Sequence, residues 1–305
     1  MEIKKNKLIV YTFLYLVIGF YFVRTTVVFD GEIEYHKSVL DKSKEQYVNR
    51  VLFPFMVQYT SELLQYKTSY LADIMRIYRF LYIIILASVA LLFQKYLMYW
   101  FDEKTAVLGT LLLLISIPFS FIITGHIDSL FDLGLFTLSA ILIVRNYYLP
   151  LIPILFVGAF NRQTIVFVAL FYFLAKFNNK NWVVVFFKAG ILALIPIITG
   201  FVVRYLRDVL DKPSYPNMFL WNVACHHCFI SVFVLFNIFW VLAFVGLRKK
   251  PFVLQRWVFV IPFFLIIHYL FGFIWETRMF LPLAVILVPL GLFSFYPESV
   301  HKISP

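Results

Sequence analysis

Long apolar stretches repeat along the whole chain, and they limit its fold more than any other feature. Stretches of roughly 20 mostly apolar residues recur throughout the 305 residues. A helix needs about that many residues to cross a bilayer, whereas the strands of a membrane barrel are shorter and alternate in hydrophobicity. Charged residues make up only 14% of the chain, against about a quarter in soluble domains. We therefore expect an all-α, polytopic integral membrane protein.

The spacing of these stretches predicts about eight transmembrane helices, which form a single transmembrane domain over residues 1–305. The predicted spans cover residues 8–28, 77–97, 105–124, 130–146, 182–203, 229–247, 257–275 and 279–296. The first stretch is too long for the core of a signal peptide and has no clear small-residue cleavage site after it. We expect it to be a retained anchor.

Residues 149–177 break this regular pattern. They hold two apolar pieces of about a dozen residues each, separated by "NRQT" (Asn161–Thr164), and each piece is too short to cross a bilayer alone. The pair predicts a re-entrant helical hairpin that enters and leaves on one side. The alternative is one long tilted helix, which would invert every later span.

The distribution of charge favours the hairpin. The chain has a net charge of +11, and basic residues on one membrane face set topology, so we expect no nucleic-acid partner. With the hairpin, the cytoplasmic segments hold 13 basic and four acidic residues, and the outer segments hold ten basic and eleven acidic residues. One long helix would instead place "LRKK" (Leu247–Lys250) outside. Both termini are therefore predicted to be cytoplasmic.

The longest outer segment, residues 29–76, is predicted to be an extracytoplasmic loop that contains its own helix. In "VLFPFMVQYTSELLQY", apolar side chains recur at helical spacing. They are Leu52, Phe55, Met56, Tyr59 and Leu63. This pattern predicts an amphipathic helix that lies in the interface against membrane lipid.

Given that topology, ten charged or imidazole side chains from separate segments converge on the outer face. They are Asp30, Glu32, Glu34, His126, Asp128, Arg162, Arg204, Arg207, Glu276 and Arg278. An ordinary solvated loop explains the acids of residues 30–34 as well as a site does. Two acids at positions i and i+2 can also share a divalent cation through oxygen ligands, and one alone can act as a general base. A divalent cation is therefore a candidate cofactor, although the sequence does not name a metal.

Arginines supply the positive charge on this face. Arg162 is predicted near membrane depth, where a guanidinium is costly and usually marks a functional or paired site. Arg204 and Arg207 lie one helical turn apart, where they either snorkel to the interface or together clamp a phosphate. Glu276 and Arg278 either cap a tight turn between two helices or belong to the same site.

The stretch Cys225-His226-His227-Cys228 has the spacing of one half of a zinc site. A structural zinc site needs two such pairs that are well separated in sequence, and the chain has only these two cysteines. A metal reading of this stretch is therefore disfavoured. His268, inside a predicted span, is expected to be a packed and hydrogen-bonded residue.

Five short stretches resemble the GT-C class of polytopic glycosyltransferases. They are "FDGEIE" (29–34), "YVNRVLFPFM" (47–56), "GHIDSLFDLGLFTLSAIL" (125–142), "FNRQT" (160–164) and "WETRMFLPLAVILVPL" (275–290). Some bacterial members of that class carry Arg-Glu-Thr near the middle and Glu-x-Arg before a final Pro-rich helix. Here the first motif reads Arg162-Gln163-Thr164, so any role of that carboxylate is absent or moved. The second motif is intact as Glu276-Thr277-Arg278.

The resemblance implies a sugar donor carried on a polyprenyl phosphate, an acceptor that is a glycan, a lipid or a protein, and an active site facing away from the cytoplasm. It implies Asp30 as the general base, arginines that bind the departing phosphate, and inversion at the anomeric carbon. We expect such an enzyme in the bacterial inner membrane, making a cell-envelope glycan. The alternatives are a transporter or flippase of an anionic lipid-linked substrate, which would be expected to show repeat symmetry and a polar midplane path, and a polysaccharide polymerase.

Overall fold

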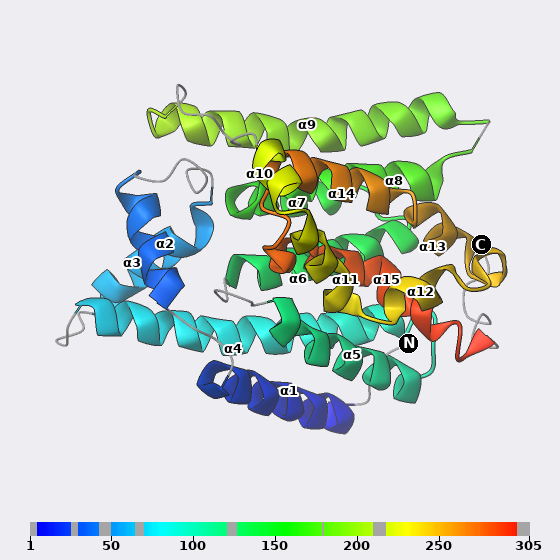
Figure 1. The fold of residues 1–305 in the computed structure, drawn as a ribbon, viewed down its shortest axis with the longest axis horizontal. Helices are drawn as coiled ribbons and strands as arrows, with labels where there is room; N and C mark the ends of the chain where they lie inside the picture. The colour runs from blue at the N-terminus through cyan, green and yellow to red at the C-terminus, as the bar shows by residue number, and fades with distance from the viewer. Residues whose placement is uncertain are drawn as a thin grey trace.

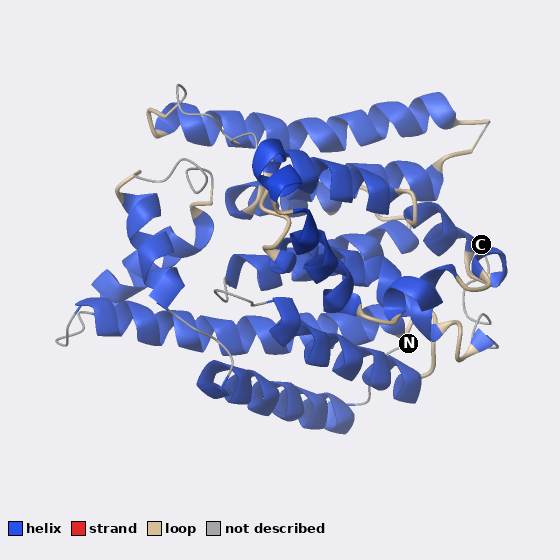
Figure 2. Ribbon diagram, viewed as in Figure 1, coloured by secondary structure: helices blue, strands red, loops and turns tan. Residues whose placement is uncertain are grey.

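The computed structural model describes residues 5–25, 30–42, 50–64, 70–120, 127–178, 180–209 and 218–297, and every regular element in these residues is helical (Figures 1 and 2). The longer helices are α1 (Lys5–Thr25), α3 (Leu52–Leu64), α4 (Tyr70–Leu97), α5 (Glu103–Ser116), α6 (Ile127–Val144), α9 (Trp182–Leu206) and α14 (Val260–Phe271). The shorter α-helices are α2 (Asp30–Leu40), α7 (Leu151–Asn161), α8 (Phe167–Lys176), α10 (Phe219–Ala224), α11 (Ile230–Phe236), α12 (Phe239–Phe244), α13 (Phe252–Trp257) and α15 (Ala284–Leu292). Short 3-10 helices are η2 (Ile117–Ser120), η3 (Gln163–Val166), η4 (His226–Phe229), η5 (Leu247–Lys249) and η6 (Thr277–Leu283). The prediction of an all-α protein is confirmed.

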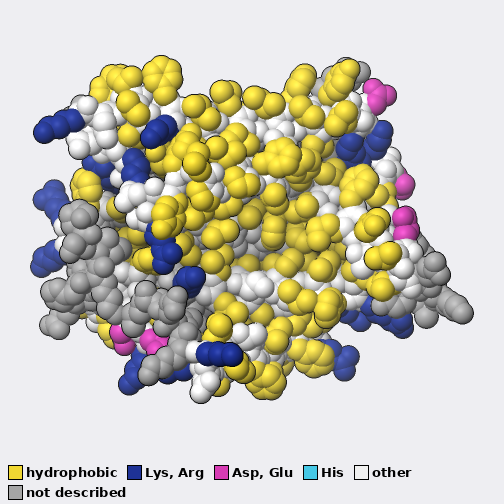
Figure 3. All heavy atoms as spheres, turned by 180° about the vertical axis from the view of Figure 1, so that it is seen from behind, with side chains coloured by type: hydrophobic (Ala, Val, Ile, Leu, Met, Phe, Trp, Pro, Cys, Tyr) yellow, Lys and Arg dark blue, Asp and Glu magenta, His cyan; other side chains and the backbone are white. Residues whose placement is uncertain are grey.

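Six helical stretches within the described residues are long and apolar enough to cross a membrane, which is consistent with a multi-pass membrane protein. They are Lys5–Thr25, Ala72–Leu97, Glu103–Ser120, Ile127–Val144, Trp182–Leu206 and Phe252–Phe271. Many of their large apolar side chains are exposed, including nearly the whole outer side of α9. On the face drawn in Figure 3, hydrophobic side chains cover the middle, and lysine and arginine side chains gather towards the two ends. That distribution is expected of a protein whose solvent is lipid along its middle.

The span predicted over residues 229–247 is not one continuous helix. It is divided into α11 and α12, and the break lies at Asn237, whose backbone has φ of 45°. Gly246 has φ of 62° and ends the segment. Asparagine and glycine tolerate this left-handed conformation better than other residues. The run of apolar residues therefore predicted the position of this segment. Asn237 and Gly246, which tolerate a left-handed backbone, set where its helices end.

The span predicted over residues 279–296 is also irregular, because proline lacks the N–H that a continuing helix needs. Its first part is the 3-10 helix η6, which contains Pro282, and the second part is α15, which contains Pro289. Every residue from Thr277 to Leu292 is buried. From Met279 to Leu292 the segment is apolar on all sides, as expected of a helical segment that protein surrounds. It forms the centre of the bundle (Figure 1).

Residues 149–177 reverse direction, as the hairpin prediction requires. The rings of Tyr148, before α7, and Tyr172, near the end of α8, lie 5.4 Å apart. One straight helix over the same residues would separate them by about 36 Å. Between the two arms, Arg162 adopts an extended conformation with φ of −152° and ψ of 139°. The side chain of Asn161 binds the backbone carbonyl of Asp128 in the first turn of α6. The tip of the hairpin therefore lies beside the N-terminal end of α6.

The region predicted as a loop over residues 29–76 is largely helical. It contains α2 and α3, and α4 already begins at Tyr70 rather than at residue 77. Helix α3 covers the apolar positions of the predicted amphipathic helix, and its side chains Phe55, Met56, Tyr59 and Leu63 are exposed. The two helices lie at the end of the bundle opposite the start of α1 (Figure 1).

Candidate functional site

Buried charged and polar side chains from five separate segments meet at the end of the bundle that carries α2. They come from α2, the stretch before α3, the first turns of α6, the tip of the hairpin and η6. The fully or almost fully buried members are Glu32, Asp128, Asp132, Asn161, Arg162 and Arg278. We call this group, together with Arg50, Thr164 and Glu276, the polar cluster. A set of charges inside so apolar a chain is costly unless its members pair with one another.

Asp128 is the centre of the polar cluster. One carboxylate oxygen, Oδ2, lies 3.0 Å from Nε of Arg162 and 3.2 Å from Nη1 of Arg50. The backbone carbonyl of Asp128 accepts a bond of 2.9 Å from the amide of Asn161. Because Asp128 stands in the first turn of α6, the positive end of the helix dipole also favours its charge.

Asp132 extends this network by one helical turn. Its Oδ1 accepts a bond of 2.8 Å from Asn161, and its Oδ2 accepts a bond of 3.2 Å from the hydroxyl of Thr164. The same Oδ2 lies 3.8 Å from Nε of Arg162. The i and i+4 spacing of Asp128 and Asp132 places both on one face of α6. Both acids therefore face the hairpin tip, and neither stands alone in the bundle.

Glu32 joins α2 to the start of α6. Its Oε1 accepts a bond of 2.9 Å from the backbone N–H of Ile127, which is one of the N-terminal donors that a helix cannot satisfy internally. Burial raises the pKa of Glu32 well above its ordinary value of 4.5, and the nearby charge of Asp128 raises it further. The bond from Ile127 and the charge of Arg278 act in the opposite direction. Glu32 therefore holds its proton more tightly than an exposed glutamate.

The Glu-x-Arg motif lies against the same cluster. Nη2 of Arg278 donates to Oε2 of Glu276 at 2.8 Å. Burial raises the pKa of Glu276, while the guanidinium groups of Arg50 and Arg162 lower it. The pairing of Glu276 with Arg278 fits both interpretations of the motif, a cap of the turn and a part of the site.

Arg204 and Arg207, one turn apart in sequence, donate to different backbone carbonyl groups. Arg204 is buried at the end of α9 and donates to the carbonyl of Val209 at 3.0 Å. Arg207 lies just beyond the helix and donates to the carbonyl of Val39 in α2. Their described partners are therefore two different carbonyl groups.

The remaining predicted residues fall outside the polar cluster or outside the described atoms. Asp30 is the first residue of α2, and its side chain lies outside the described part of the structure, as does the whole of His126. Glu34 is exposed while Glu32 is buried, because residues two apart on a helix do not share a face. These two acids therefore do not share a cation. Among the described residues there is no group of three or more histidine, cysteine, aspartate or glutamate side chains that suits a metal ion.

The sequence reasoning missed several members of the polar cluster. None of Asp132, Arg50, Asn161 and Thr164 was predicted as a site residue. The spacing of Asp128 and Asp132 was the signal that could have found the second acid. Nothing local marks Arg50, which the hydroxyl of Tyr35 holds by a bond of 2.7 Å to its carbonyl.

A groove adjoins the polar cluster on the side of α9. It is a cavity of about 450 Å³ between η3, α8, α9 and α14. Its polar lining comes from Gln163, Thr164 and Arg204, and the rest is apolar. The apolar lining residues are Val166, Phe167, Pro196, Ile197, Phe201, Ile267 and Phe271. Thr164 belongs to both the groove and the cluster, since its hydroxyl binds Asp132.

Cys225 and Cys228 form a disulfide, so they are not available as a pair of zinc ligands. His268 is buried, and its Nδ1 binds the carbonyl of Phe264 at 2.7 Å. That carbonyl can only accept, so Nδ1 carries the proton. The expectation of a packed and hydrogen-bonded His268 is confirmed.

Comparison with known proteins adds no family to this description. No family model matches the chain, and no match was found among curated proteins or solved structures. The geometry of the polar cluster and its groove is therefore the basis for a functional proposal.

Proposed function

We propose that the protein is a membrane glycosyltransferase of the GT-C type, which moves a sugar from a polyprenyl-phosphate donor to a glycan, lipid or protein acceptor on the extracytoplasmic side. The observation that carries the proposal is the buried pair of Asp128 and Arg162, joined by the partly buried Arg50, next to a groove lined mainly by apolar side chains. A lipid-linked phosphate needs both surroundings at once. Its chain needs an apolar path, and its charged head needs guanidinium groups at the end of that path.

Arg162 is the member of the cluster best placed to bind the phosphate. Its Nε is engaged by Asp128, while its buried Nη2 donates to no acceptor in the described part of the chain. A buried donor without an acceptor is costly, and a bound phosphate oxygen would satisfy it. Arg50, Arg278 and Arg204 are further guanidinium groups at this end, from the stretch before α3, from η6 and from α9.

The proposed reaction is a single displacement. The acceptor oxygen attacks the anomeric carbon as Asp30 takes its proton, and the bond from that carbon to the phosphate oxygen breaks. The polyprenyl phosphate leaves with the bonding electron pair, and the arginines stabilise its developing charge. One displacement inverts the configuration of the sugar. Glu32, Glu34, His126 and Asp128 remain candidates for holding the acceptor, and Glu276 for orienting Arg278.

We place the protein in the bacterial inner membrane with both termini in the cytoplasm. The six long helical stretches would then be joined by two broken crossings, α11 with α12 and η6 with α15, while α7 and α8 form the re-entrant hairpin. This arrangement puts α2, α3 and the polar cluster on the outer side. The exposed apolar side chains of α3 would lie in the lipid interface.

The proposal is tested by purifying the protein in detergent and offering a panel of polyprenyl-phosphate sugars. Release of free polyprenyl phosphate measures turnover. Asp30→Asn should abolish turnover, and Arg162→Lys should reduce it at least tenfold, because lysine lacks the second arm of the fork. Arg145→Lys is the matched control, since Arg145 lies beyond the other end of α6, over the ring of Tyr99. Full turnover by Asp30→Asn would remove Asp30 as the base.

A flippase would give a different result in the same experiment. Reconstituted into liposomes, it would move a lipid-linked sugar across the bilayer and release no lipid phosphate. That outcome would refute the transferase proposal.

A further inference from the structure

Helix α10 is too short to be stable alone. It has six residues, whereas isolated helices shorter than about 12–15 residues are marginal in water. Its neighbours in the structure are the C-terminal end of α14 and the loop that follows, residues 272–276. The backbone N–H of Met218, just before α10, donates to the carbonyl of Leu270 at 3.0 Å.

The side chain of Asn222 makes most of this connection. Its Nδ2 donates to the carbonyls of Tyr269 and Gly272, each at 2.7 Å. Its Oδ1 accepts from the backbone N–H of Ile274 at 3.1 Å. The carbonyls at the end of a helix have no partner within that helix. One fully buried amide therefore caps α14 and holds the following loop in place.

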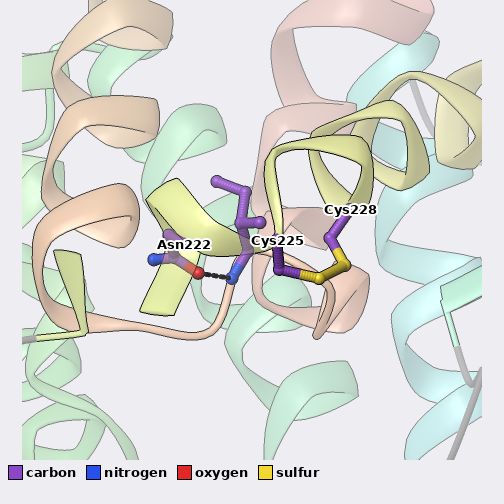
Figure 4. Close-up of a disulfide and its surroundings, with 4 residues drawn as sticks. Asn222, Cys225 and Cys228 are labelled. Atoms are coloured by element: carbon purple, nitrogen blue, oxygen red, sulfur yellow. Dashed lines mark hydrogen bonds between the residues drawn. A yellow bond between two sulfur atoms is a disulfide. The ribbon is translucent and has the colours of Figure 1, made fainter. Parts of the chain in front are cut away.

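The disulfide fixes the other end of α10 (Figure 4). Cys225 is the residue that ends this helix, and it is bonded to Cys228 in η4. The crosslink ties the end of α10 to the turn before α11, which limits how far α10 can unwind. Figure 4 shows Asn222 near the disulfide.

Aromatic rings pack along the same contact. The rings of Trp221 and Phe273 lie 4.9 Å apart in an edge-to-face arrangement, and those of Trp221 and Trp275 lie 6.0 Å apart. The loop thus contacts α10 through side chains as well as through Asn222. Trp275 is followed directly by Glu276, and Arg278 lies two residues after Glu276.

We infer that Asn222 and the Cys225–Cys228 disulfide form a clamp that sets the position of residues 272–276 and, through them, of Glu276 and Arg278 in the polar cluster. Asn222 is then a positioning residue, because it touches neither arginine nor carboxylate of the cluster. The effect of the clamp on catalysis rests on the proposed function, but its effect on the loop does not. A disulfide persists in an oxidising compartment, which agrees with the outer placement proposed for this end.

The clamp has a reduced state that a dithiol can produce. Dithiothreitol supplies two electrons and two protons to the Cys225–Cys228 bond, which becomes two thiols, while the reagent becomes a cyclic disulfide. The two thiols can then be capped with N-ethylmaleimide and counted by mass. We expect two capped cysteines after reduction and none before it. Two capped cysteines without reductant would overturn the disulfide half of the clamp.

Hydrogen exchange over residues 270–278 tests the positioning directly in the full-length protein. Asn222→Leu keeps the approximate size of the side chain and removes its three hydrogen bonds, so exchange in this segment should rise at least about tenfold. Reduction of the wild-type protein should also raise it. Asn181→Leu, an exposed asparagine before α9, is the matched control and should leave exchange unchanged. Exchange in α6 reports whether the effect is local, and it should not change.

Two further arms separate the possible failures. Cys225→Ser with Cys228→Ser should show faster exchange that dithiothreitol no longer alters. Unchanged exchange over 270–278 in Asn222→Leu or in the reduced protein would overturn the clamp, whatever the enzyme assay shows. In the turnover assay, Asn222→Leu should lower kcat more than it changes KM. The control variant Asn181→Leu should change neither. If the wild-type protein turns over no lipid-linked sugar, the proposed function fails while the exchange data still decide the clamp.

Discussion

The ion pair between Asp128 and Arg162 should be one of the most strongly coupled contacts in the molecule. The exposed fraction of the side chain is 1% for Asp128 and 4% for Arg162. Removing one partner of a buried pair leaves the other charge without compensation and costs about 3–5 kcal/mol. Asp128→Asn and Arg162→Gln should therefore each lower the free energy of unfolding by about that amount. The double variant leaves neither charge behind, so its loss should be well below the sum of the two.

The assay is a double-mutant cycle, with unfolding of the purified protein followed in mixed micelles of increasing denaturing detergent. We expect a coupling free energy of about 2–4 kcal/mol, which is the part of the single losses that the double variant avoids. The control cycle uses Lys7 and Glu103, whose nitrogen and oxygen lie 2.6 Å apart with side chains 53% and 21% exposed. That pair should couple by at most about 1 kcal/mol. Equal coupling in the two cycles would refute the argument that burial makes the site pair strong.

Three further results are expected. Lys250→Met should lower the free energy of unfolding by about 2–6 kcal/mol, because the carbonyls of Ala243 and Leu290 would lose their ammonium donor; the exposed neighbour variant Lys249→Met should unfold like the wild-type protein. Gly200→Ala should reduce turnover without unfolding the protein, since the new Cβ would collide with the side-chain amide of Gln163, which lines the groove and must move. The pKa of Glu32 is higher in the folded protein than its ordinary value of 4.5, so the folded state binds this proton more tightly. The protonated carboxyl of Glu32 therefore stabilises the folded state fully below about pH 4.5, and this contribution is lost as pH rises towards the folded pKa. Detergent unfolding at several pH values should therefore show a smaller decline in Glu32→Gln, and an unchanged decline would contradict the assignment.

The helical class and the approximate position of the long helices could be predicted because both depend on local composition. An apolar run of about 20 residues has few other options in lipid. The hairpin was also predictable, since each arm is too short to cross and "NRQT" interrupts them. The breaks at Asn237 and in η6 were harder to predict. Asparagine tolerates a left-handed backbone without requiring it, and proline stops one helix without stating whether another follows at once.

The acids of residues 30–34 show where local pattern misled. Alternate spacing in an extended loop puts such acids side by side, and that conformation was assumed. In the structure these residues begin α2, so the carboxylates of Glu32 and Glu34 diverge, one buried and one exposed. The buried carboxylate accepts a hydrogen bond from the start of α6, a partner 95 residues away. A contact at that separation leaves no periodicity for a single sequence to reveal.

Charge balance in an apolar chain nevertheless carries more information than its local spacing suggests. A guanidinium at the depth of Arg162 must find an opposite charge, so the presence of this residue alone predicts a buried carboxylate nearby. The sequence offers only a few acids within or beside its apolar stretches, and Asp128 and Asp132 share one helix face at i and i+4. Pairing Arg162 with the acids that share a face selects the contacts that the structure has at 3.0 and 3.8 Å. The same pairing rule does not predict Arg50, because this residue lies before α3 in a segment whose composition predicts a solvated loop.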